Sequence, residues 1–202
     1  SKVSSFAAQY LEVPLIYVNQ IGANDNLIFD GNSFILDKNG SKIKQLKSFS
    51  EDHFSWEIGQ TLPEKNKFQD SEISSIFDAL VLGVRDYAKK CGFKTALIGL
   101  SGGIDSALVS AIAAAALGSN NIYCVSMPSK WSSSHSKSDA KDLARRLKIN
   151  FNSIPIENLM TSFEESFVKS TDFEMAEITN QNIQSRIRGT LLMALANQEK
   201  HL

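Results

Sequence analysis

The stretch that decides the fold is Gly99-Leu100-Ser101-Gly102-Gly103-Ile104-Asp105-Ser106. It follows the apolar run 96–100 and leads into an alanine-rich run that stops at Gly118, so we expect it to join a strand to a helix. Free N–H groups and the helix dipole favour an anion at such a junction. Paired glycines let phosphate oxygens approach the backbone, and Ser101 and Ser106 add hydroxyl donors. The stretch therefore predicts a phosphate-binding loop.

Asp105 indicates a metal ion in the same loop. A carboxylate would repel a bare phosphate, which suggests a cation such as Mg²⁺ between Asp105 and a pyrophosphate. The loop is not of the Walker type, because no lysine follows Gly103, and it lacks the dinucleotide pattern Gly-x-Gly-x-x-Gly. The plain structural alternative is a strand–turn–helix corner in which Asp105 caps the helix.

The sequence around the loop alternates helices and strands. Apolar spacings of three and four predict a helix that starts after Ser71 and stops at Gly92. Further strands are expected at 122–127 and 149–156, and further helices at 139–147, 159–168 and 180–197. Buried strands alternating with helices predict an α/β domain over residues 71–202, with a parallel sheet covered by helices on both faces.

The first fifty residues follow a different pattern. A short helical stretch precedes strand-like runs, including Leu15–Val18 and a run at 33–36 between two turn dipeptides. Residues 51–70 lack periodicity and contain a Pro-led polar run, so we expect a linker there. The predicted organisation is therefore residues 1–50, a linker at 51–70 and a domain at 71–202.

Composition excludes several classes of function. The 202 residues carry 21 basic and 22 acidic side chains, a balance that argues against a nucleic-acid partner. Two cysteines, Cys91 and Cys124, do not make the disulfide framework of a small secreted protein. No apolar run approaches the length of a membrane span. We expect a cytoplasmic chain with no membrane partner.

The loop resembles the Ser-Gly-Gly-x-Asp-Ser loop of the ATP pyrophosphatase superfamily, which includes NAD, GMP and asparagine synthetases. The resemblance implies an adenine nucleotide α-hydrolase-like, Rossmann-like fold, with ATP and Mg²⁺ as cofactors and Asp105 as a metal ligand. It also implies that the loop holds the pyrophosphate of ATP. Residues expected to bind ATP or pyrophosphate are Gly99, Leu100, Ser101, Gly102, Gly103, Ile104, Asp105, Ser106 and Met127.

Two further stretches resemble NAD synthetases in particular. Val125-Ser126-Met127-Pro128-Ser129 is similar to the segment whose backbone meets the adenine ring, at Met127. Asn182-Ile183-Gln184-Ser185-Arg186-Ile187-Arg188-Gly189 is similar to that family's Asn-Ile-Gln-Ala-Arg-Ile-Arg helix, with Ser185 replacing alanine. Asn182 and Arg186 share a helix face, and the resemblance implies that they bind deamido-NAD. Arg188 is expected to point elsewhere, and the alternative is a solvated helix with scattered arginines.

The N-terminal residues 14–22 and 27–34 resemble the late part of a nitrilase-type glutaminase, an α/β sandwich. In fused synthetases the Glu-Lys-Cys triad of that domain lies upstream of such a stretch, so no glutaminase catalytic residue is assigned in this chain. The family's Thr-Thr-Gly-Asn-Lys segment would follow Leu202. We therefore expect the central part of a glutamine-dependent NAD synthetase, with the synthetase domain incomplete at its C-terminus and inactive alone.

The implied reaction is the ATP-dependent amidation of deamido-NAD to NAD through an acyl-adenylate. The expected partners are deamido-NAD, ATP and glutamine or ammonia, and the expected assembly is a homodimer or a larger homo-oligomer. Two alternatives stay open. One is another amidating or thiolating ATP pyrophosphatase, such as a GMP synthetase, and the other is a non-catalytic nucleotide-binding subunit. A structural scaffold has the least support.

Overall fold

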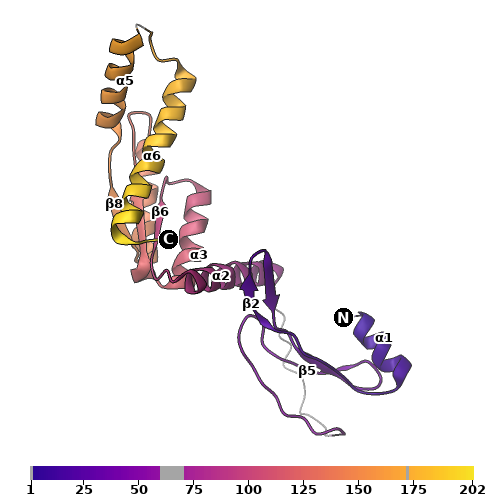
Figure 1. The fold of residues 1–202 in the computed structure, drawn as a ribbon. Coiled ribbons are helices and arrows are strands. Elements are labelled where there is room, and N and C mark those ends of the chain that lie inside the picture. The colour runs from indigo at the N-terminus through magenta and orange to yellow at the C-terminus, as the bar shows by residue number, and fades with distance from the viewer. Residues whose placement is uncertain (1, 60–70, 172) are drawn as a thin grey trace. The chain divides into compact units, whose positions relative to one another are not determined.

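The computed structural model describes residues 2–59, 71–171 and 173–202. The chain divides into two compact units, residues 1–87 and residues 88–202, and each is described by itself. Of the linker predicted at 51–70, residues 60–70 lie outside the described residues. The division of the chain into three parts at 50 and 70 stays a prediction. Figure 1 shows the elements of both units along the chain.

The first unit contains one helix, a small sheet and a hairpin before it reaches the long helix α2. Helix α1 covers Lys2–Leu11 and packs against β1 and β4, where Ala8 and Leu36 are buried. The sheet is antiparallel, in the order β1 (Leu15–Tyr17), β4 (Phe34–Leu36) and β5 (Lys42–Gln45). The hairpin pairs β2 (Ile21–Asn24) with β3 (Leu27–Asp30). The expected helix and the strands at 15–18 and 33–36 are confirmed, although the first strand is exposed at Ile16 and Tyr17 rather than buried. The nitrilase-like assignment stays a prediction.

Helix α2 (Glu72–Cys91) has the ends that its sequence predicts. The Ser71 hydroxyl accepts the Ser74 N–H at 3.1 Å, as an N-terminal cap does. At the other end Gly92 has a φ of +77°, and the Phe93 N–H returns to the Ala88 carbonyl at 2.8 Å. This backbone conformation favours glycine and ends the helix.

The second unit is built on a parallel sheet in the order β6 (Ala96–Gly99), β7 (Ile122–Ser126) and β8 (Asn150–Ser153). Helix α3 (Ile104–Leu117) and the short 3₁₀ turn at Ser119–Asn121 connect β6 to β7. Helix α4 (Ser134–Leu147) connects β7 to β8. Helices α5 (Glu157–Thr171) and α6 (Glu177–Glu199) follow, and Leu202 then pairs with the backbone of β6 through Thr95 and Leu97.

Successive side chains of β7 point to opposite faces of the sheet, and each face has its own helices. Ile122 and Cys124 are buried against small residues of α3 and α4, including Ala113 and Ala140. Val125 and Met127 are buried instead with Met160 of α5 and the apolar side of α6. The parallel sheet covered on both faces is therefore confirmed.

Several boundaries differ from those predicted, including those of α4, β8, α5 and α6. Helix α4 starts at Ser134 rather than 139, because the Ser133 hydroxyl accepts the Ser136 N–H at 3.0 Å and so caps it earlier. The strand expected over 149–156 is assigned only over Asn150–Ser153. Its backbone nevertheless continues to follow β7, since the Ile154 N–H donates to Ser126 and the Ile156 N–H donates to Pro128. Among the described residues no helix is both long enough and apolar enough to cross a bilayer.

Candidate phosphate-binding site

The loop quoted first lies at the carboxyl end of β6, where α3 begins (Figure 1). A pocket of about 340 Å³ opens at this edge of the parallel sheet. Its walls come from four places in the sequence: the loop at Gly99–Ser101, the end of β7 with Met127, the start of α4, and α6. The carboxyl edge of a parallel sheet is where α/β proteins of this type bind ligands.

The serine hydroxyls of the loop bond to the loop itself. Ser106 Oγ donates to the Gly103 carbonyl at 3.0 Å and accepts the Ser101 N–H at 3.3 Å. Ser101 Oγ accepts the Gly103 N–H at 3.2 Å and lies 3.1 Å from Ser106 Oγ. These four contacts close the turn from both ends. The loop is thus held in shape by the two residues that were predicted to bind phosphate.

The start of α3 keeps its backbone donors available. Gly103 is the N-cap residue, and no side chain caps the helix. The first helical bond runs from the Ala107 N–H to the Gly103 carbonyl at 3.1 Å. The N–H groups of the first turn, Ile104 to Ser106, therefore precede the hydrogen-bonded ladder and carry the positive end of the helix dipole. This arrangement binds an anion well.

Gly102 is the one position of the loop where no other residue fits. Its φ is +87°, and a Cβ built on it would lie 2.2 Å from the backbone oxygen of Ser136. The first turn of α4 therefore contacts the loop directly. Gly103 is less constrained, because its φ of −86° is ordinary and an added Cβ would meet only Ser101 Oγ, at 3.3 Å.

Asp105 lies in the first turn of α3, where its side chain is exposed. It does not line the 340 Å³ pocket. Within the part of the chain that the structure describes, no three His, Cys, Asp or Glu side chains gather as a metal site. Mg²⁺ binds through as few as one carboxylate when phosphates supply other ligands, so a single exposed carboxylate beside the loop has the chemistry for it.

The other end of the pocket is apolar. Met127 is buried, and an added Cβ on Gly99 would lie 3.5 Å from its terminal carbon and 3.2 Å from a methyl group of Leu192. Val125 and Pro128 also line this end. An apolar slot of this kind suits an uncharged ring, whereas the loop end suits an anion.

Arg188 is a residue of this pocket that the sequence did not assign to any site. It points away from the face of Asn182 and Arg186, as expected. Its Nε donates to the Met127 carbonyl at 3.0 Å, and its Nη2 lies 3.4 Å from Gln184 Oε1. Burial lowers the pKa of the guanidinium below its usual value, although it still carries its charge. In the sequence, the sign of this placement was the spacing of four residues from Arg188 to both Gln184 and Leu192. All three residues lie on the half-buried side of α6.

Asn182 and Arg186 lie together on the exposed side of α6. Arg186 Nη1 is 3.4 Å from the Asn182 carbonyl, so the two share a face as predicted. Arg186 lines a shallow groove of about 630 Å³ with Gly189, Met193 and Asn197. Neither Asn182 nor Arg186 lines the pocket at the loop. The two predicted binding regions therefore open on different sides of one helix.

Sheet order, the glycine-rich loop and the pocket at the carboxyl edge together define a Rossmann-like α/β domain. A model of the NAD synthase family matches residues 76–202, and the chain belongs to that family. The glutamine-dependent NAD(+) synthetase of Synechocystis is 45% identical over 98% of this chain and 36% of its own length. That of Rhodobacter capsulatus is 41% identical over 92% of this chain and 35% of its own length.

Solved structures agree with this assignment. The glutamine-dependent NAD+ synthetase of Acinetobacter baumannii, in complex with adenosine diphosphate, superposes with a TM-score of 0.87 at 37% identity. The match covers 98% of this chain and 38% of that one. The synthetase of Cytophaga hutchinsonii has the same fold, with a TM-score of 0.83 at 18% identity. The chain spans little more than a third of the length of the relatives named here.

Proposed function

We propose that this chain carries the ATP site of a glutamine-dependent NAD synthetase, with the synthetase domain at residues 71–202. The observation that supports it most is the pocket at the carboxyl edge of the sheet, with a polar phosphate loop at one end and an apolar slot at the other. The relative from Acinetobacter baumannii, which has the same fold, was solved with adenosine diphosphate. An adenine nucleotide matches both ends of the pocket.

In the proposed reaction a nicotinate carboxylate oxygen of deamido-NAD attacks the α-phosphorus of ATP. The bond from that phosphorus to the bridging oxygen breaks, its electron pair leaves with pyrophosphate, and an acyl-adenylate forms. Ammonia, from glutamine in the intact protein, then attacks the acyl carbon and releases AMP and NAD. A carboxylate is a poor acyl donor, and adenylation gives it a good leaving group.

The residues of this chain act by position and charge. The first-turn N–H groups of α3 and the hydroxyls of Ser101 and Ser106 are proposed to bind the departing pyrophosphate. Met127 and the slot around it are proposed to hold the adenine ring, and Arg188 fixes the Met127 carbonyl there. Asp105 is the proposed ligand of Mg²⁺, which when bound would neutralise phosphate charge.

For deamido-NAD we propose the exposed face of α6 with Asn182 and Arg186. A guanidinium forms paired hydrogen bonds with a carboxylate or a phosphate. In the intact protein, Arg186→Ala is expected to raise the Michaelis constant for deamido-NAD far more than that for ATP. Equal increases for both substrates would contradict this assignment.

The test of the function is an assay of the intact protein with ATP, Mg²⁺, ammonium and either deamido-NAD or xanthosine monophosphate. NAD, AMP and pyrophosphate are expected in equal amounts with deamido-NAD only. Turnover of xanthosine monophosphate would favour a GMP synthetase, and nucleotide binding without pyrophosphate release would favour a non-catalytic subunit. Asp105→Ala should abolish NAD formation and leave glutamine hydrolysis measurable.

We further propose that residues 1–50 belong to a nitrilase-like glutaminase part, and that the protein works in the cytoplasm as a homodimer or a larger homo-oligomer. Support comes from the relative in Synechocystis, whose similarity extends over 98% of this chain and therefore into those residues. Light scattering on the intact protein measures the subunit number. A monomer that forms NAD at full rate would contradict the oligomer.

A further inference from the structure

The phosphate loop of this chain lacks a cation of its own. Its donors are neutral N–H and hydroxyl groups, and no lysine follows Gly103. Pyrophosphate carries several negative charges, so a site for it needs positive charge as well as hydrogen bonds. Beyond the Mg²⁺ proposed at Asp105, a positively charged side chain has to come from outside the loop.

Lys137 of α4 is placed to supply it. It lines the same pocket as Ser101 and follows Ser136 directly, the residue whose carbonyl abuts Gly102. Within the described residues the Lys137 ammonium makes no ion pair and no side-chain hydrogen bond. The charge of Lys137 is therefore not used by a neighbouring side chain.

The charges in the pocket wall also support this role for Lys137. Among the residues that the structure describes, the charged ones in the wall are Lys137 and Arg188, both cationic, and no carboxylate lines the pocket. Arg188 is bonded to the Met127 carbonyl at the apolar end. Lys137 comes instead from the first turns of α4, beside the loop. The two cations thus serve different ends of the pocket.

We propose that Lys137 binds the β- and γ-phosphates of ATP and the pyrophosphate that they become, in place of the lysine that the loop does not contain. This rests on the proposed function for the identity of the nucleotide, but the binding of pyrophosphate can be measured without turnover. Lys137 stabilises the charge that collects on the leaving group as the bond to the α-phosphorus breaks.

The experiment compares Lys137→Met with Lys141→Met in the intact protein. Lys141 lies one turn further along α4, is exposed and does not line the pocket, so it is a matched control. Calorimetric titration with inorganic pyrophosphate should show binding weakened about tenfold or more in Lys137→Met and unchanged in Lys141→Met. AMP, which lacks the β- and γ-phosphates, should bind both variants as it binds the unaltered protein. Lys137→Arg should restore most of the pyrophosphate affinity.

Each outcome decides something. Unchanged pyrophosphate affinity in Lys137→Met, or an unaltered protein that binds no pyrophosphate, overturns the proposal. Loss of AMP affinity equal to that of pyrophosphate also overturns it, because the effect would not belong to the β- and γ-phosphates. If pyrophosphate binding depends on Lys137 but deamido-NAD and ATP give no NAD, only the proposed function fails. If NAD forms and Lys137→Met binds pyrophosphate normally, only this inference fails.

Discussion

Helices α3 and α4 begin beside one another at the phosphate loop, and their starts are built differently. At α4 the Ser133 hydroxyl accepts the Ser136 N–H at 3.0 Å, so a side chain satisfies one of the free donors. At α3 the residue in that position is Gly103, and no side chain caps the helix. Both starts lie at the carboxyl edge of the same sheet.

The start of α4 is stabilised by a side-chain cap, whereas the start of α3 leaves its backbone N–H groups open to an anion. A cap lowers the free energy of the folded chain and occupies the N–H groups that an anion would use. The uncapped start of α3 forgoes that stabilisation and keeps its donors available. The serines of the loop bond to the loop and to each other instead, so the turn keeps its shape without covering those donors.

The largest effect is expected from Gly102→Ala, which breaks the contact between the two starts. The new Cβ would lie 2.2 Å from the Ser136 carbonyl oxygen, and φ is +87°. Strain and overlap together should lower the free energy of unfolding by about 2–5 kcal/mol and abolish pyrophosphate binding. Denaturant unfolding and calorimetry measure the two effects. Gly103→Ala, with ordinary backbone angles, should cost no more than about 1 kcal/mol, and equal losses in both variants would contradict the role of Gly102.

Ser106→Ala should weaken ligand binding at the start of α3 more than it lowers the stability of the fold. The hydroxyl of Ser106 joins the Gly103 carbonyl and the Ser101 N–H, so its loss loosens the loop. Pyrophosphate affinity is expected to fall about tenfold or more, since a hydrogen bond to a charged group contributes about 1.5–3 kcal/mol. Ser138→Ala is the control, because Ser138 is exposed on α4 and its hydroxyl donates to the His135 carbonyl. Unchanged pyrophosphate affinity in Ser106→Ala would argue against an open, preorganised start.

Ser133→Ala should lower the stability of the fold at α4 and affect pyrophosphate binding less. Loss of the cap is expected to lower the free energy of unfolding by about 1 kcal/mol. Pyrophosphate affinity should change less than it does in Ser106→Ala, because Ser133 caps α4, whereas Ser106 bonds to the Gly103 carbonyl and the Ser101 N–H within the loop. Thermal unfolding and calorimetry on one sample measure both. If Ser133→Ala weakens pyrophosphate binding as much as Ser106→Ala does, the two helix starts do not differ as described.

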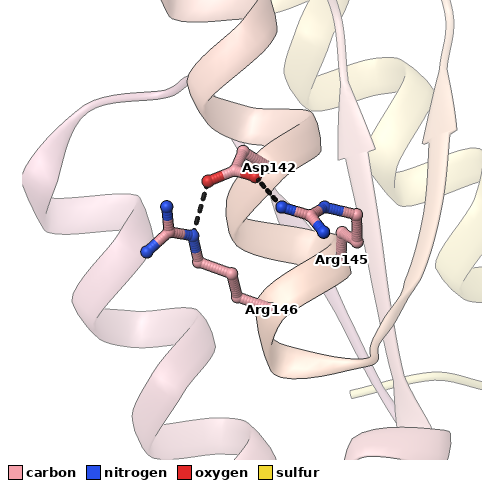
Figure 2. A network of polar contacts seen from close by, with 3 residues as sticks. All are labelled: Asp142, Arg145 and Arg146. Atoms are coloured by element: carbon pink, nitrogen blue, oxygen red, sulfur yellow. Dashed lines mark hydrogen bonds and ion pairs between the residues drawn. The ribbon is translucent and has the colours of Figure 1, made fainter.

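The smallest effect is expected at the far end of α4. Figure 2 shows Asp142 between two arginines, with contacts of 2.6 Å to Arg145 and 2.5 Å to Arg146. Hydrogen bonds from Arg145, then from Arg146, lower the pKa of Asp142 below its usual 3.8. Because folding lowers the pKa of Asp142, the carboxylate adds stability at pH values above its pKa in the unfolded chain. That stability is lost as the pH falls through its pKa in the folded chain.

The pairs around Asp142 are exposed, so the contribution is small and salt weakens it. Asp142→Asn should therefore unfold slightly more easily than the unaltered protein at pH 7, with a difference that closes as the pH falls below about 3.8. Melting curves across that range measure it. A difference that stays constant with pH would mean that the ion pairs are not its cause. Pyrophosphate affinity should not change, because Asp142 does not line the pocket.

The sequence was enough to predict those features of the fold that depend on residues adjacent along the chain. The loop, the α3 helix that follows it and the ends of α2 were predicted from glycine, serine and apolar spacing, and the structure has them. The start of α4 was predicted five residues too late. A serine-rich run can cap a helix at several positions, and in the structure Ser133 is the residue that caps it.

What the sequence alone determined is a glycine-rich turn between a strand and a helix, because a few adjacent residues set the turn, the open donors and the helix start. The tertiary structure decided which distant residues complete it. Parallel pairing brings the ends of β6 and β7 to one edge, and the packing of α4 and α6 there puts Lys137 and Arg188 into the pocket. It also turns Arg186 away from that pocket. Such choices depend on which face of a helix is buried, and that is fixed only when the helix packs against the sheet.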